Sequence, residues 1–139
     1  MTESSRSNPA IRVIMMPKDT NAMGTIFGGV ILSYIDQAAA IQACKYASQR
    51  FVTKALNAVE FKAPVHLGDV VSFYTSIIKV GRTSLTVKVD VEAERFDEQE
   101  GAHVVKVTEA TVVCVAIDPA GRSALIQAAL PSRIDTQGE

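Results

Sequence analysis

The chain has 139 residues, the length of one ordinary domain, and 47% of them are hydrophobic, which excludes a disordered chain. It carries 14 basic and 15 acidic side chains with no basic or acidic block, so its charge gives no support for binding nucleic acid or an anionic membrane. No apolar run reaches the roughly 18 residues of a membrane span, and no secretory signal is evident, so we expect a cytoplasmic protein.

The N-terminal third of the chain predicts a loose arm, a short strand and a long helix. Residues 1–10 are mostly polar and are expected to form the arm, and the apolar run at 11–16 is typical of a strand. After a stretch rich in turn formers, a helix is expected from Gly28 to about Ala47, because apolar residues mostly recur there at helical spacing. Its alanines make it slim, which favours burial against a sheet.

The rest of the chain predicts strands, because the hydrophobic period changes to two. The expected strands are 51–61, 70–80, 83–95 and 102–118, with an acidic loop at 96–101. Short connections between consecutive strands imply antiparallel pairing. The predicted fold is therefore α+β, an antiparallel sheet of about five strands wrapped around one long central helix. This single domain would span 11–126, with a loose tail at 127–139, and dimerisation would cover its edges.

Asp36 is a carboxylate in the middle of the predicted apolar helix. None of its neighbours at helical spacing carries a positive charge; they are Leu32, Ser33, Ala39 and Ala40. Burying a carboxylate without a partner costs free energy, because desolvation disfavours its charged form. Asp36 is therefore either a solvated surface residue or a functional group that could activate water or attack a carbonyl.

Two further features lie near the start of this helix. Gly28 and Gly29 open it, where the first amides have no partner within the helix and the helix dipole is positive. Glycines let a ligand approach such amides, which can bind an anion or stabilise an oxyanion, although the same pair also suits a tight loop-to-helix transition. Asn21 precedes the helix, and its amide could orient water or a carbonyl oxygen, or could simply form a turn.

Other chemistry has little support in the sequence. The two histidines, His66 and His103, each lie alone among β residues, and no metal-binding spacing of histidines or cysteines occurs, so we expect no metal and no cofactor. Cys44 and Cys114 fall in apolar patterns and are expected to be small buried hydrophobic side chains rather than a disulfide or a nucleophile.

Several of these residues belong to an ordered set of motifs. The set begins with Pro17-Lys-Asp19-Thr-Asn21-Ala-Met-Gly24-Thr-Ile-Phe27-Gly28-Gly29, followed by Asp36. It continues with Phe61-Lys-Ala-Pro64-Val-His-Leu-Gly68-Asp69-Val, then Val80-Gly81-Arg82-Thr83-Ser84, then Thr108-Glu109-Ala110 through to Val115-Ala-Ile-Asp118. Together these motifs cover roughly residues 11–123. They resemble the hotdog-fold acyl-CoA thioesterases, most closely the YciA-like branch related to the eukaryotic cytosolic acyl-CoA hydrolases.

The resemblance implies a hotdog fold that pairs across a dimer into one continuous sheet, often as a trimer of dimers, with active sites at the dimer interface. It implies that Asp36 is catalytic, that Asn21 of the opposite subunit works with it, and that the amides of Gly28 and Gly29 polarise the thioester carbonyl. Phe27 and the helix are expected to line part of an apolar acyl channel. Contact with CoA is expected from the turn that carries Arg82, Thr83 and Ser84, a basic, hydroxyl-bearing turn that could also hold a phosphate.

The reaction that the resemblance implies is hydrolysis of acyl-CoA to a free acid and CoA. Asp36 would either activate water or attack to form an anhydride, and both routes stay open. A hotdog dehydratase or hydratase would need a histidine near the helix, and none lies between Met1 and Val65. An acyl-CoA-sensing domain would bind without hydrolysis, but the chain has no basic helix-turn-helix pattern and keeps Asp36.

Overall fold

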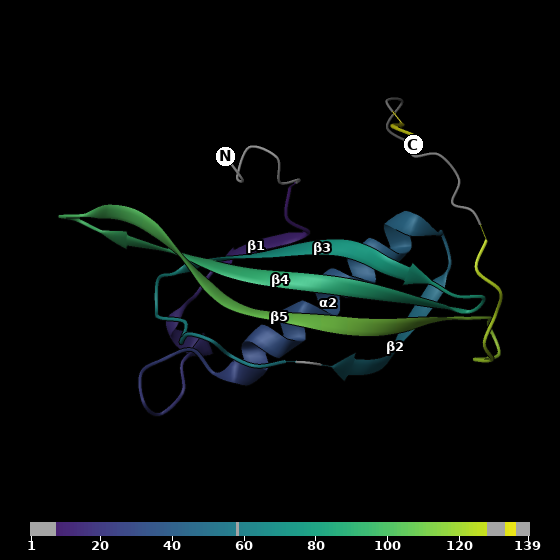
Figure 1. Cartoon of the computed structure of the whole chain (residues 1–139), viewed down its shortest axis with the longest axis horizontal. Helices are drawn as coiled ribbons and strands as arrows, with labels where there is room; N and C mark the ends of the chain where they lie inside the picture. Colours follow the sequence, from purple (N-terminus) through teal and green to yellow (C-terminus); the bar gives the residue numbers. More distant parts are fainter. Residues whose placement is uncertain (1–7, 58, 128–132, 136–139) are drawn as a thin grey trace.

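The protein is described here by a computed structural model, which covers residues 8–57, 59–127 and 133–135. The elements in chain order are β1 (Ile11–Ile14), the short 3-10 helix η1 (Pro17–Asp19), α2 (Gly28–Tyr46), β2 (Arg50–Asn57), β3 (Val70–Val80), β4 (Ser84–Asp97) and β5 (Gly101–Ile117). The five strands form one antiparallel sheet in the order β1-β3-β4-β5-β2. Helix α2 lies across one face of this curled sheet, which confirms the predicted α+β layout (Figure 1).

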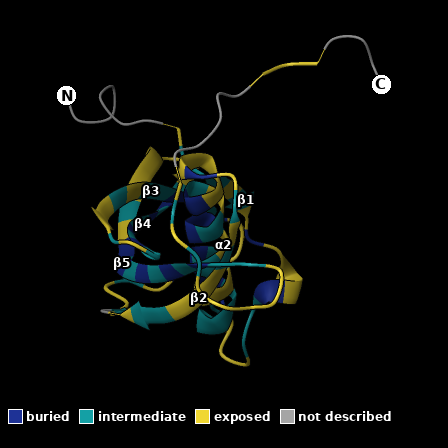
Figure 2. Ribbon diagram, turned by 90° about the vertical axis from the view of Figure 1, so that its right-hand side faces the viewer, coloured by how far each residue is buried: buried dark blue, intermediate teal, exposed yellow. Residues whose placement is uncertain are grey.

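Small side chains let α2 lie close to the sheet. Ala38, Ala39 and Ala43 are fully buried, and Ile31 and Ile35 add larger apolar contacts on the same side of the helix. The buried residues recur three or four positions apart, as expected for one stripe of an α-helix. The remaining faces of α2 stay partly exposed (Figure 2).

Strand β4 supplies the centre of the core with alternate side chains. Its inward residues are all fully buried; they are Leu85, Val87, Val89, Val91 and Ala93. The residues between them are only half-buried, so β4 has one buried face and one partly solvated face. The arrangement places α2 and every side chain that faces it on the concave side of the sheet.

Three predicted strand ends were wrong. Strand β1 ends at Ile14 rather than at residue 16, shortly before Pro17 opens η1. Strand β2 ends at Asn57 rather than at residue 61, because further along, the chain contacts β5 through single hydrogen bonds, from the Thr108 hydroxyl to the Glu60 carbonyl and from the Lys62 amide to the Val107 carbonyl.

Strand β4 runs to Asp97, so the acidic loop shrinks to a tight turn. Its tip is stabilised by the Asp97 carboxylate, which accepts hydrogen bonds from the amides of Gln99 and Glu100.

The ends of the chain fall partly outside the described residues. Of the predicted arm at 1–10, residues 1–7 lie outside them, and so do 128–132 and 136–139 of the predicted tail. The segment just before that tail is tied down: the Gln49 side chain donates to the Leu125 carbonyl and accepts from the Gln127 amide. Within the described ranges, no helix is long and apolar enough to cross a membrane.

A buried ion pair joins the loop before β3 to the long β4–β5 hairpin. Arg95 donates through Nε and Nη2 to the two carboxylate oxygens of Asp69, at 3.0 and 2.8 Å, and also to the Pro64 carbonyl. The Asp69 side chain is only 2% exposed. Burial alone would raise the pKa of Asp69, but the hydrogen bonds from Arg95 and from the His66 amide outweigh it and hold that pKa below its usual value.

Replacing Arg95 by alanine should destabilise the fold by about 2–3 kcal/mol, because it leaves the Asp69 carboxylate buried with one hydrogen-bond donor instead of three. Urea unfolding at neutral pH measures this loss. Lys88→Ala is the matched control, since Lys88 pairs with half-exposed Glu109 and should cost less than about 1 kcal/mol.

The same pair predicts a pH dependence. Because the folded-state pKa of Asp69 is lowered, its contribution to stability is present above the unfolded-state pKa and is lost as pH falls through the folded-state pKa. The stability difference between wild type and Arg95→Ala should therefore shrink on acidification. A difference that stayed constant down to low pH would show that the charge of Asp69 contributes little.

Candidate active site

The start of α2 offers two unoccupied hydrogen-bond donors. The helix begins at Gly28, and its N-cap residue Phe27 provides no side-chain cap. The Phe27 carbonyl accepts from the Val30 amide at 3.0 Å, whereas the amides of Gly28 and Gly29 have no acceptor among the described residues. Since no acidic side chain lies in the first turn, the positive end of the helix is available to an anion or a polarised carbonyl oxygen.

Two aromatic rings flank these amides. A Cβ atom placed on Gly29 would lie 2.6 Å from the Phe27 ring, so glycine is needed at this position for the ring to keep its place. A Cβ on Gly28 would lie 3.8 Å from Cζ of Phe61, an ordinary contact. Phe27 and Phe61 are both large exposed apolar side chains. The sequence predicted a role for Phe27 and gave no indication of one for Phe61.

Backbone hydrogen bonds fix the position of this helix start. The Phe27 amide donates to the Asp19 carbonyl at 2.8 Å, and the Ile26 amide donates to the Val65 carbonyl at 2.9 Å. Asp19 is itself buried, and its carboxylate accepts from the Met16 amide at 2.9 Å. The loop that precedes α2 is therefore held from two sides, which keeps the glycine amides in a defined place.

Asp36 lies half-buried on α2 and has a hydroxyl partner on the neighbouring strand. Thr53 Oγ1, on β2, donates a hydrogen bond to Asp36 Oδ1. Thr53 faces α2 because it pairs directly with buried Cys114 of β5. Asp36 Oδ2 has no hydrogen-bond partner among the described residues, so it can accept one from a ligand or a water molecule. The search along the helix therefore missed Thr53, which the fold supplies from another element.

The two cysteines differ in environment. The pKa of the Cys114 thiol is raised to about 11, mainly because the thiol is buried and to a smaller extent because Asp36 and Cys44 lie nearby. Cys114 is therefore protonated at neutral pH and is not an activated nucleophile. The prediction that Cys44 is buried was wrong: it is exposed near the end of α2, where its thiol donates to the Gln49 carbonyl.

Asn21 forms its own loop rather than contacting Asp36 within one chain. Its Oδ1 accepts from the amides of Met23 and Thr25, at 2.9 and 3.2 Å, and its Nδ2 donates to Thr25 Oγ1 at 3.0 Å. Gly24 completes this turn with a φ of +86°, which favours glycine. One hydrogen of the Asn21 amide remains for another acceptor.

The turn of Arg82, Thr83 and Ser84 lies at the end of the sheet opposite to the start of α2 (Figure 1). It is a tight β3–β4 connection in which the Gly81 amide donates to the Ser84 carbonyl at 2.7 Å. The segment that follows β5 packs along it through a bond from the Ile126 amide to the Arg82 carbonyl. A single chain therefore does not bring this turn to Gly28 and Gly29.

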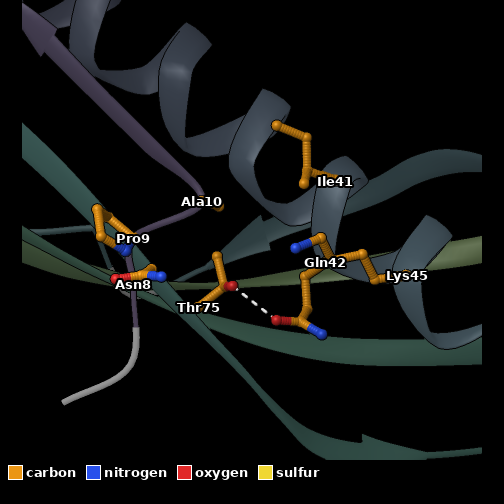
Figure 3. Close-up of a pocket in the computed structure, with 7 residues that line it drawn as sticks. All are labelled: Asn8, Pro9, Ala10, Ile41, Gln42, Lys45 and Thr75. Atoms are coloured by element: carbon orange, nitrogen blue, oxygen red, sulfur yellow. Dashed lines mark hydrogen bonds between the residues drawn. The ribbon is translucent and has the colours of Figure 1, made fainter. Parts of the chain in front are cut away.

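A cavity of about 300 Å³ lies between the chain before β1, the C-terminal half of α2 and β3 (Figure 3). Gln42 and Thr75 are hydrogen-bonded at 2.7 Å across it, and Lys45 lies beside them. None of the predicted site residues lines it. Within the described ranges, no three histidine, cysteine or acidic side chains gather to hold a metal ion.

The sequence profile of the thioesterase superfamily matches residues 23–98. An uncharacterised acyl-CoA thioester hydrolase of Zymomonas mobilis is 44% identical over 110 residues, which cover 79% of this chain and 72% of the relative. The acyl-CoA thioester hydrolase YciA of Salmonella typhimurium is 36% identical over 122 residues, which cover 88% of this chain and 92% of the relative.

Solved structures agree with these relatives. A hexameric hotdog fold thioesterase of Campylobacter jejuni superposes with a TM-score of 0.83 at 41% identity, covering 87% of this chain and 91% of that one. An aspartate-to-alanine variant of a hexameric, broad specificity acyl-coenzyme A thioesterase superposes with a TM-score of 0.82 at 38% identity, covering 88% of both chains. The chain therefore belongs to the hotdog-fold thioesterase superfamily, in which its relatives include acyl-CoA thioester hydrolases of the YciA type.

Proposed function

We propose that this thioesterase hydrolyses acyl-CoA, adding water across the carbon–sulfur bond to release a free carboxylic acid and CoA. Family membership supports the class of reaction, and the names of the relatives support the substrate class. The observation that carries the proposed mechanism is the hydrogen bonding of Asp36. One of its oxygens is held by Thr53, and the other is free to accept a proton from water or to attack the carbonyl. The reaction needs no co-reactant other than water.

The free amides at the start of α2 are the proposed site for the thioester carbonyl oxygen. Gly28 and Gly29 can both donate to it, and the helix dipole favours the negative charge that develops there. A single donor of this kind typically contributes about 10²–10³ in rate. The hydrogen bonds from Ile26 and Phe27 support this role, because donors placed in advance need no reorganisation during the reaction.

The spacing along α2 supports a site shared between two subunits. Gly28 and Asp36 are eight residues apart on one helix (36 − 28), which corresponds to about 12 Å along its axis. A reacting carbonyl has to lie about 3 Å from both the oxyanion donors and the attacking group. We therefore propose that Asp36 acts on a carbonyl held by the helix start of a second copy.

Strand β2 is the proposed dimer edge. It is the last strand of the sheet and carries Thr53, so pairing there would bring Asp36 close to the other subunit. The remaining amide hydrogen of Asn21 would then serve the site from the loop before the partner's helix, and the turn at Arg82 would contact CoA. Two similar structures are described as hexameric, which supports a trimer of dimers as the final assembly.

Asp36→Asn should lower kcat for acyl-CoA hydrolysis by about 10²–10⁴-fold, because the amide keeps the shape of the side chain but cannot accept the proton. Free thiol released from acetyl-CoA through palmitoyl-CoA, read with a thiol reagent, measures this loss. The melting temperature should stay close to that of wild type. Wild type that binds acyl-CoA but releases no more thiol than Asp36→Asn would instead support a sensing domain.

Thr53→Val should lower kcat by about 10–100-fold, since it removes the hydroxyl that orients Asp36 while keeping a β-branched side chain in β2. Thr53→Ser is the matched control, because it keeps the donor and should retain most of the activity. Equal activity of Thr53→Val and wild type would refute the orienting role.

A further inference from the structure

Phe61 presents an exposed aromatic ring to the start of α2 from a segment that is distant in sequence. The ring is 41% exposed and lies outside the buried core, yet it lies next to the space above Gly28. Exposing a ring of this size leaves apolar surface in contact with water, which burial against a ligand would remove. Because the ring lies beside the free amides of Gly28 and Gly29, that ligand would be the one that these amides bind.

The backbone on both sides of Phe61 is fixed to strand β5. The Thr108 hydroxyl, from a fully buried side chain, donates to the Glu60 carbonyl at 2.7 Å. On the other side, the Lys62 amide donates to the Val107 carbonyl at 2.7 Å. The residue that carries the ring is therefore held in place although the ring itself is exposed. This is the pattern of a preorganised contact residue rather than of a loose surface side chain.

We propose that Phe61 is a specificity-determining residue that forms the wall of the acyl pocket next to the thioester carbonyl. This inference rests on the proposed function, because it places the carbonyl oxygen on the amides of Gly28 and Gly29. The Phe27 ring fills the space into which a side chain on Gly29 would point, whereas the space above Gly28 is open up to the Phe61 ring, so we place the acyl substituent on the side of Phe61. Contact with the ring favours acyl chains of several carbons over acetyl, by about fourfold for each methylene that it covers.

The test compares acetyl-CoA with hexanoyl-CoA. Binding is measured by calorimetry in the Asp36→Asn background, where neither ligand is consumed, with Phe61 intact and with Phe61→Ala. We expect Phe61→Ala to lower the hexanoyl-to-acetyl affinity ratio about 15-fold, the loss of contact with roughly two methylenes. The kcat/KM ratio of the otherwise wild-type enzyme should fall in parallel.

Two variants make the test specific. Phe61→Leu keeps an apolar side chain and should retain most of the selectivity. Phe61→Gln, which is polar but larger than alanine, replaces Phe61→Ala if that variant does not fold and should lower the ratio in the same direction. Phe96→Ala removes an aromatic ring that is 63% exposed on the protruding β4–β5 hairpin and should leave the ratio unchanged (Figure 1).

An unchanged hexanoyl-to-acetyl ratio in Phe61→Ala would overturn the proposal, as would equal weakening of both ligands, which would place the ring against the CoA arm instead. Neither result would affect the proposed hydrolysis. That proposal fails separately, if wild type releases no thiol from any acyl-CoA.

Discussion

The rigidity of helix α2 is the constraint on which the rest of the site depends. The helix fixes two free amides at one end and a carboxylate about two turns further along, and packing of its alanines against the sheet holds it in place. Because a helix neither bends nor shortens to bring these groups together, we propose that one chain contributes them to two different sites. On this proposal, the exposed edge of β2, next to Asp36, is the surface through which a second copy would complete each site.

Much of the motif that precedes α2 builds the loop that carries the glycine pair. The carbonyl of Asp19 and the carboxylate of the same residue bond to backbone amides, and Asn21 folds its side chain into the turn closed by Gly24. The loop before β3 also holds the start of α2, because its Val65 carbonyl accepts a hydrogen bond from the Ile26 amide. The Asp69–Arg95 ion pair anchors that loop to β4. The position of the glycine amides is thus set by polar contacts far from the helix itself.

The sequence predicted the fold class, the long helix and most strand limits, because hydrophobic period and turn residues are local signals. It also located Asp36 and the glycine pair, which stand out within their own segments. Thr53 and Phe61 were missed because their relevance depends on how β2 and the loop before β3 lie against α2. The signal that the sequence did offer for Thr53 is a hydroxyl side chain at an inward-facing position of the strand that follows the helix. The early end of β2 was missed for a similar reason, since it depends on how the chain after β2 bonds to β5.

The most direct test of the shared site is complementation between subunits. Asn21→Ala and Asp36→Asn chains, each of which we expect to lose most of its activity by itself, are co-expressed and assayed for thiol release. If the two residues act from different subunits, roughly a quarter of wild-type activity should return, because half of randomly formed dimers are mixed and each mixed dimer has one intact site. If activity stays at the level of the single variants, Asn21 and Asp36 belong to the same subunit's site and the account is contradicted.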